Sequence, residues 1–126
     1  MSYKMTIEPM GNYLHVRTCG EQNYEVALAT WREIVNACRQ YQCYHILDEA
    51  CMDNSLTTMD AWGHQQIFAE AGVTPSMKIA WVDLNPATYD STKFVETVLL
   101  NRGLVNGRLF SSVTEAKQWL LDRTGS

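Results

Sequence analysis

The segment that most restricts the possible folds is 77–84, MKIAWVDL, because it is apolar almost throughout after Lys78. It lies between Pro75 and the strand-breaking pair Asn85-Pro86. An apolar run of this length between breakers predicts a parallel strand that is covered on both faces. Such strands occur inside sheets that carry helices on both sides, so we expect an α/β protein.

The segments around this strand alternate between strand and helix patterns. Strands are predicted on both sides of the turn at 9–12, which makes an antiparallel hairpin, and again at 44–48 and 104–110. Helices are predicted over 24–40, 57–72 and 91–102, and a fourth opens with a capping box at Ser112. The segment 49–56 is polar and is expected to be a loop. The order β-β-α-β-α-β-α-β-α predicts one domain, residues 1–126, with a mostly parallel central sheet, an antiparallel N-terminal hairpin edge and four helices.

Charge and hydropathy patterning exclude several classes of function. The net charge is −4, and the ten Lys and Arg residues are scattered singly, so no nucleic-acid partner is expected. The N-terminal segment has no apolar stretch typical of a secretory signal, and no apolar run approaches the ~20 residues of a membrane span. We therefore expect a cytoplasmic protein without a transmembrane segment. Residues 124–126 are expected to form a frayed end.

The four cysteines are Cys19, Cys38, Cys43 and Cys51. No two of them have Cys-x-x-Cys spacing, and no histidine lies at zinc-finger distance, so neither a structural metal nor a cofactor is expected. In a reducing compartment such residues are small buried side chains. The prediction is four free thiols.

The ordered set of segments YHILD at 44–48, MKIAWVD at 77–83, FVETVLLNRG at 94–103, RLF at 108–110 and TEAKQWL at 114–120 resembles a known family. It is similar to the SpoIIAA-like fold of STAS domains, in particular to short stand-alone bacterial proteins, and this fold is related to the CRAL-TRIO lipid-exchange domains. The resemblance covers nearly the whole chain. It implies a binding or regulatory role.

The resemblance also implies candidate phosphorylation sites. In anti-sigma-factor antagonists of this family, a serine in an Asp-x-Ser motif begins the helix after a central strand, and its phosphorylation blocks docking on a partner kinase. Asp53-Asn54-Ser55 is the matching element here, but Leu56-Thr57-Thr58-Met59 follows it in place of the family's glycine-rich Ser-Ser-Gly-Leu. Ser55 and Thr57 are the phospho-acceptor candidates. The competing interpretation makes Thr57 a helix N-cap and Ser55 a loop hydroxyl.

Acidic residues follow the strands predicted to lie side by side. Asp48, Glu49, Asp53 and Asp83 are expected to form an acidic rim at the carboxyl ends of these strands, where open α/β sheets bind ligands. Oxygen ligands of this kind suit Mg²⁺. The competing interpretation is a solvated edge of turn-forming carboxylates. His15, His45 and His64 are the usual general-base candidates, but no nucleophile motif accompanies them.

The predicted helix 57–72 has apolar residues on two sides. Met59, Trp62 and Phe68 are therefore candidates for a partner or ligand surface. The competing interpretation is a wide core-facing side with one exposed aromatic ring.

Three hypotheses follow. The favoured one is a non-catalytic module that docks a protein partner, or a second copy of itself, through the loop and helix at 48–72. The first alternative is a binder of an apolar small molecule or lipid, by analogy with CRAL-TRIO domains. The second is a magnesium-dependent enzyme that uses the acidic rim.

Overall fold

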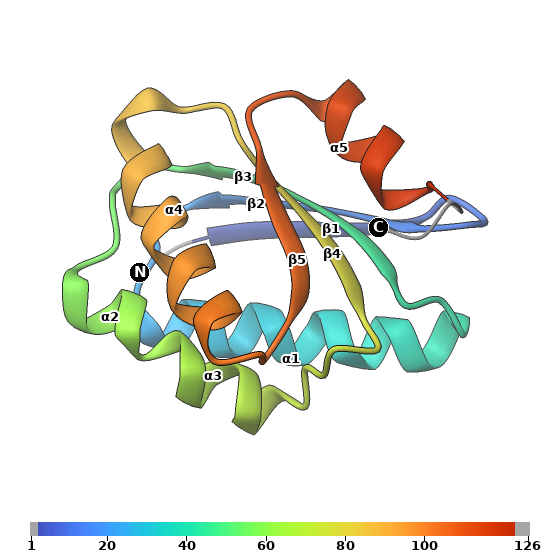
Figure 1. Ribbon diagram of the computed structural model, residues 1–126, viewed down its shortest axis with the longest axis horizontal. Helices are drawn as coiled ribbons and strands as arrows, with labels where there is room; N and C mark the ends of the chain where they lie inside the picture. Colours follow the sequence, from blue (N-terminus) through green and yellow to red (C-terminus); the bar gives the residue numbers. More distant parts are fainter. Residues whose placement is uncertain (1–2, 123–126) are drawn as a thin grey trace.

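The computed structural model describes residues 3–122 and shows one mixed sheet with helices on both faces (Figure 1). The strand order is β1-β2-β3-β4-β5; β1 and β2 pair antiparallel, and the other neighbours pair parallel. The strands are β1 (Tyr3–Pro9), β2 (Leu14–Gly20), β3 (His45–Met52), β4 (Lys78–Asp83) and β5 (Asn106–Phe110). The helices are α1 (Tyr24–Tyr41), α2 (Thr58–Trp62), α3 (His64–Ala71), α4 (Pro86–Asn101) and α5 (Val113–Leu120). The predicted fold class and the N-terminal hairpin are confirmed, while residues 124–126 lie outside the described range.

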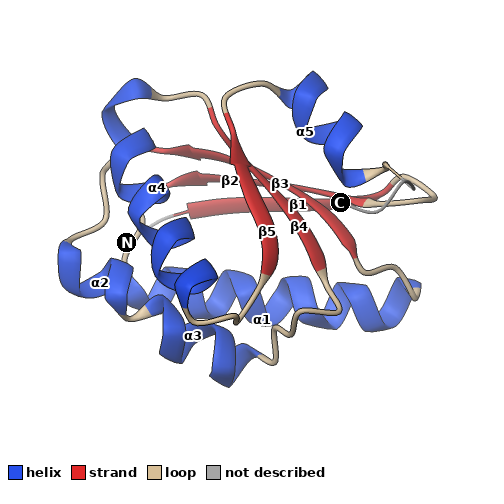
Figure 2. Ribbon diagram, in the orientation of Figure 1, coloured by secondary structure: helices blue, strands red, loops and turns tan. Residues whose placement is uncertain are grey.

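Helices flank the sheet on both sides (Figure 2), and the sheet separates two apolar cores. Because side chains alternate along a strand, Ile46 of β3 faces the large core under α1, α3 and α4, and Leu47 faces the small core under α5. All six residues of β4 are buried, as the apolar segment predicted. The α5 helix covers β3, β4 and β5 on its face of the sheet.

Strand β3 is longer than predicted. It continues to Met52, so the expected loop 49–56 begins only at Asp53. The polar residues of this stretch are held in the sheet by pairing on both sides: Cys51 pairs with Cys19 of β2, and Glu49 pairs with Val82 of β4. Pairing with two neighbours outweighs the low strand propensity of the segment.

The predicted helix 57–72 is present as two segments that meet at Gly63. Thr57 caps the first segment, because its side chain accepts a hydrogen bond from the N–H of Asp60 at 3.1 Å, and Gly72 ends the second with φ 88°. A Cβ at Gly63 would lie 3.0 Å from the ring of Tyr24, so the break brings α1 close to this position. Glycine is also a weak helix former, which favours a break there.

Helix α4 begins five residues earlier than predicted. Asn85 is its N-cap and accepts from the N–H of Ala87 at 2.9 Å, and Pro86 occupies the first helical turn. The pair that ends β4 therefore also starts α4, as proline at the first helical position allows.

Candidate functional site

A cavity of about 90 Å³ lies between the sheet and the helices α1, α3 and α4. Strands β2, β3 and β4 form one wall, and the rings of Trp31, Phe68 and Trp81 form much of the rest. Gln22 and Leu56, both half-buried, line it from the loops that follow β2 and β3. The cavity thus lies towards the carboxyl ends of the parallel strands, where ligands bind in open α/β sheets.

The two loops at this end are joined by hydrogen bonds. The N–H of Gln22 donates to Oδ1 of Asn54 at 2.9 Å, and Nδ2 of Asn54 donates to the carbonyl of Gln22 at 2.9 Å. The side-chain amide of Gln22 also donates to the carbonyl of Asn54. These bonds hold the segment after β3 against the segment after β2.

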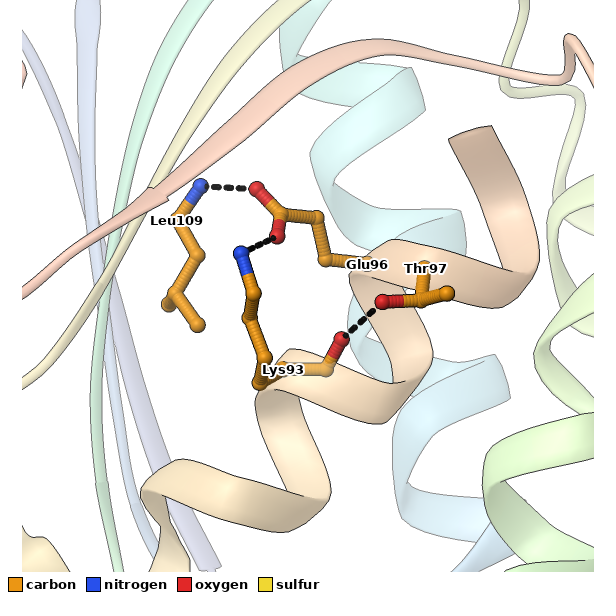
Figure 3. Close-up of polar contacts among 4 residues, drawn as sticks. All are labelled: Lys93, Glu96, Thr97 and Leu109. Atoms are coloured by element: carbon orange, nitrogen blue, oxygen red, sulfur yellow. Dashed lines mark hydrogen bonds and ion pairs between the residues drawn. The ribbon is translucent and has the colours of Figure 1, made fainter. Parts of the chain in front are cut away.

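The Glu96 carboxylate lines the cavity but is fully engaged elsewhere. One oxygen accepts the backbone N–H of Leu109 on the edge strand β5 at 2.6 Å, and the other accepts Nζ of Lys93 at 2.7 Å (Figure 3). The hydrogen bond to Glu96 and the charge of its carboxylate raise the pKa of Lys93, which keeps the Lys93 ammonium group protonated at neutral pH. Glu96 is 4% exposed, so it satisfies an edge-strand donor inside the protein.

Three other polar groups on the cavity wall have no such partner. Within residues 3–122, the Asp48 carboxyl and the Thr18 hydroxyl make no side-chain hydrogen bond or ion pair, although Thr18 is 8% exposed. Nδ1 of His64 donates to the carbonyl of Asp60 at 2.8 Å, which leaves Nε2 without a partner. No enclosed side-chain nitrogen or oxygen among the described residues lacks a partner, so these three groups border open space.

The charge states of these groups follow from their burial. Loss of hydration raises the pKa of Asp48 from 3.8 to about 7, and no charged neighbour offsets this. Burial also lowers the pKa of His64, which keeps its imidazole neutral. Because Nδ1 carries the proton, Nε2 is a hydrogen-bond acceptor. Thr18 was not predicted as a cavity residue, although Leu14 and Val16 point inward at the same two-residue spacing.

Asp83 has a structural environment. It is 2% exposed, and its carboxylate accepts the Thr88 hydroxyl at 3.0 and 2.8 Å, the Thr92 hydroxyl at 2.9 Å and the N–H of Asn85 at 3.0 Å. These bonds tie the end of β4 to the first turns of α4. The carboxylate has no free face for a ligand.

The predicted acidic rim does not form. Asp48 and Glu49 lie inside β3 and, as neighbours in a strand, point to opposite faces of the sheet. Asp53 is exposed in the loop after β3, and Asp83 is held by α4. In the part of the chain that the structure describes, no three His, Cys, Asp or Glu side chains gather closely enough to hold a metal ion. The prediction failed because it ended β3 at Asp48.

On the face of the sheet that carries α5, strands β2 and β3 are joined by two cross-strand contacts between side chains. Nε2 of His15 lies 3.0 Å from Oε1 of Glu49. Cys19 and Cys51, which pair directly in the sheet with Cα atoms 4.6 Å apart, form a disulfide. This part of the prediction of four free thiols is wrong, because the pairing of β2 with an extended β3 was not foreseen.

The other two cysteines, Cys38 and Cys43, are free. Burial raises the pKa of Cys38 to about 11, so this thiol stays protonated at neutral pH. Disulfides are typical of oxidising compartments. The cytoplasmic location remains a prediction.

The phospho-acceptor candidates hold the loop and the start of α2. Ser55 is exposed, and its hydroxyl donates to the carbonyl of Ala87 at 2.8 Å. Thr57 is the N-cap of α2. Both hydroxyls therefore have local structural roles, and phosphorylation of either residue stays a prediction.

The three residues of the predicted partner or ligand surface separate. Met59 is 83% exposed and Trp62 is 45% exposed. The rings of Trp62 and Phe94 pack edge-to-face, with their centroids 5.8 Å apart. Phe68 is 1% exposed and lines the cavity. The break at Gly63 turns the outer face of α2 to solvent and the apolar face of α3 to the core, so Phe68 is not part of an outer surface.

Known structures share this architecture across almost the whole chain. An anti-sigma factor antagonist from Mycobacterium paratuberculosis superposes with a TM-score of 0.63 at 15% identity, covering 96% of both chains. An uncharacterized DUF3478-family protein with a SpoIIAA-like fold from Shewanella loihica PV-4 gives a TM-score of 0.50 at 14% identity, covering 94% of this chain and 93% of the other. The chain has the SpoIIAA-like fold. No protein-family model matches the sequence, and no curated protein matches it significantly.

The shared SpoIIAA-like fold confirms the resemblance noted from the ordered segments, and at these identities it establishes the fold alone. None of the helices within residues 3–122 combines the length and the apolar character needed to cross a membrane. Two features of the structure suit binding: the cavity under the sheet and the exposed face of α2.

Proposed function

We propose that the chain is a non-catalytic regulatory module that docks a protein partner through its docking face, defined as the loop 53–57 and helix α2. The observation that carries this proposal is Met59, the most exposed large apolar side chain among residues 3–122 at 83%. Trp62, one turn along the same short helix, is 45% exposed and adds a second large apolar side chain to the face. Exposed apolar side chains of this size on one element are typical of interaction surfaces.

The charge around the docking face defines the partner. Residues 40–77 contain no Lys or Arg and five acidic residues. Two of these acidic residues, Asp53 and Asp60, belong to the docking face. The partner is therefore a protein with an apolar pocket for Met59 and Trp62 and a basic rim around it. Charge complementarity of this kind raises the association rate and makes it depend on ionic strength.

The shape of the docking face is fixed before binding. Ser55 is bonded to Ala87, Asn54 to Gln22, and Thr57 caps α2. A pre-ordered face loses little conformational entropy on association. The fold likeness supports the same role, because one of the matching structures is an anti-sigma factor antagonist, a protein named for its action on another protein.

The test uses matched single variants and a partner identified by affinity capture. With both proteins purified, Met59→Ser and Trp62→Ser should each weaken binding at least tenfold, since truncating a hot-spot anchor costs about 2 kcal/mol or more and 1.4 kcal/mol is a factor of ten. Tyr41→Ser is the matched control, because Tyr41 at the end of α1 is 45% exposed, as Trp62 is.

Circular dichroism spectra of all three variants should match the parent spectrum. Binding should also weaken as salt is raised from 50 to 500 mM. A partner that binds both docking-face variants as tightly as the parent chain would overturn the proposal, as would the absence of any saturable partner. A sedimentation experiment separates docking of a second copy from docking of another protein.

A further inference from the structure

The cavity beneath β3 offers hydrogen-bond acceptors that the protein leaves unused. His64 is 6% exposed, and its Nε2 is an acceptor without a donor among the described residues. The Asp48 carboxyl faces the same cavity with no hydrogen bond or ion pair. Both groups border the cavity, and Asp48 is half-buried, so both are accessible to an occupant that donates hydrogen bonds.

The charges on the wall restrict the occupant further. Among residues 3–122, Asp48, His64 and Glu96 are the titratable side chains that line the cavity, and no Lys or Arg side chain lines it. An anionic ligand would face the unpaired Asp48 carboxyl and a Glu96 carboxylate that already holds the Lys93 ammonium. A cationic ligand would meet Asp48 directly and lie among aromatic rings, whose faces attract cations.

The size of the cavity limits the ligand or the part of it that enters. A cavity of about 150 Å³ holds one benzene molecule. At about 90 Å³, this cavity has room for roughly four non-hydrogen atoms. The rings of Trp31, Phe68 and Trp81 provide the apolar contact for a short carbon chain.

We propose that this cavity is a binding site for a small primary amine, whose ammonium group pairs with Asp48 and donates to His64 Nε2 while its short carbon chain packs against Trp31, Phe68 and Trp81. The proposed amine site does not use the apolar side chains Met59 and Trp62 of the docking face, which do not line the cavity, although Leu56 of the loop 53–57 does line it. It adds a ligand site to a protein proposed to act by binding another protein.

The experiment is a titration of the ¹⁵N-labelled full chain with n-propylamine, which has four non-hydrogen atoms. The indole N–H signals report on location: Trp31 and Trp81 line the cavity, whereas Trp62 and Trp119 do not. Saturable shifts of the first two signals with a dissociation constant on the order of 1 mM are expected for so small a ligand. The signals of Trp62 and Trp119 should stay in place.

Two matched ligands and two variants test the role of charge. n-Propanol has the same shape without the charge, propionate carries the opposite charge, and both should bind at least tenfold more weakly. Asp48→Asn should weaken amine binding at least tenfold. Asp53→Asn, which removes an exposed carboxylate that does not line the cavity, should leave binding unchanged.

The pH dependence is an independent readout. Burial raises the pKa of Asp48 to about 7, and the amine stays charged below pH 10. Affinity should therefore rise about tenfold from pH 6 to pH 8, as the ionised fraction of Asp48 rises by that factor. Equal binding of amine and alcohol, shifts confined to Trp62 or Trp119, unchanged binding in Asp48→Asn, or no saturable shift at 50 mM amine would each overturn the proposal.

Discussion

The isolated carboxyl group in the sheet makes a specific prediction about stability. Asp48 lies on the cavity wall without a hydrogen bond or ion pair in the described part of the chain, so its ionised form is poorly solvated. Replacing it by asparagine keeps the shape and removes the charge. We predict that Asp48→Asn is more stable than the parent chain at pH 8, and that the gain shrinks as the pH falls.

The direction in which the free energy of unfolding changes with pH follows from proton linkage. The folded-state pKa of Asp48 is raised from 3.8 to about 7, so between these values the folded chain holds a proton that the unfolded chain has lost. The parent chain therefore loses stability as pH rises from about 4 to about 7, with a full effect of about 4 kcal/mol for this shift. Between pH 5 and pH 8 the change is about 2 to 3 kcal/mol, and solvent in the cavity reduces it towards about 1 kcal/mol.

Urea unfolding of both proteins at pH 5 and pH 8 measures this difference. The free energy of unfolding of Asp48→Asn, relative to the parent chain, should be larger at pH 8 than at pH 5 by about 1 to 3 kcal/mol. Asp53→Asn is the matched control and should show a difference within about 0.5 kcal/mol at both pH values. A pH-independent difference, or a less stable Asp48→Asn at pH 8, would refute the argument that this carboxyl is buried without a partner.

Two further predictions concern covalent and polar links of the sheet. The Cys19–Cys51 disulfide joins residues 32 positions apart, so Cys19→Ser should lower the free energy of unfolding by about 3 to 4 kcal/mol. Cys43→Ser is the control and should leave the free energy of unfolding unchanged. Equal unfolding midpoints of the parent chain with and without a reductant would contradict this prediction. Glu96→Ala should lower the free energy of unfolding by about 2 to 3 kcal/mol and speed hydrogen exchange at the Leu109 amide, because that N–H loses its acceptor. Glu96→Gln keeps an acceptor and should have a smaller effect on both. Unchanged exchange at Leu109 in Glu96→Ala would contradict a stabilising role for the contact in Figure 3.

The fold could be predicted from the sequence because its strands and helices carry strong periodic signals. The run 77–84 predicted a strand buried on both faces, and all six residues of β4 are buried. Thr57 and Ser112 lie at the starts of α2 and α5 with cap hydrogen bonds, so capping chemistry located two helix starts. Such signals are local and can be recognised without knowledge of the tertiary structure.

The site was less predictable because it depends on strand pairing. The end of β3 is set by its neighbours β2 and β4, and only the extended pairing brings Cys19 and Cys51 together and places Asp48 and Glu49 on opposite faces. The break at Gly63 likewise depends on the approach of Tyr24 from α1. These contacts link residues 30 or more positions apart, and no local pattern reports them.

The proposed function requires that the partner protein contacts the docking face. The most direct measurement places a photo-crosslinking side chain at Met59 on α2, and in a second chain at Gln118 on α5, which packs on the opposite side of the sheet (Figure 1). Both positions are exposed, so both variants should fold as the parent chain does. We expect a covalent adduct with the partner from position 59 and none from position 118. Crosslinking from 118 alone, or equally from both positions, would contradict it.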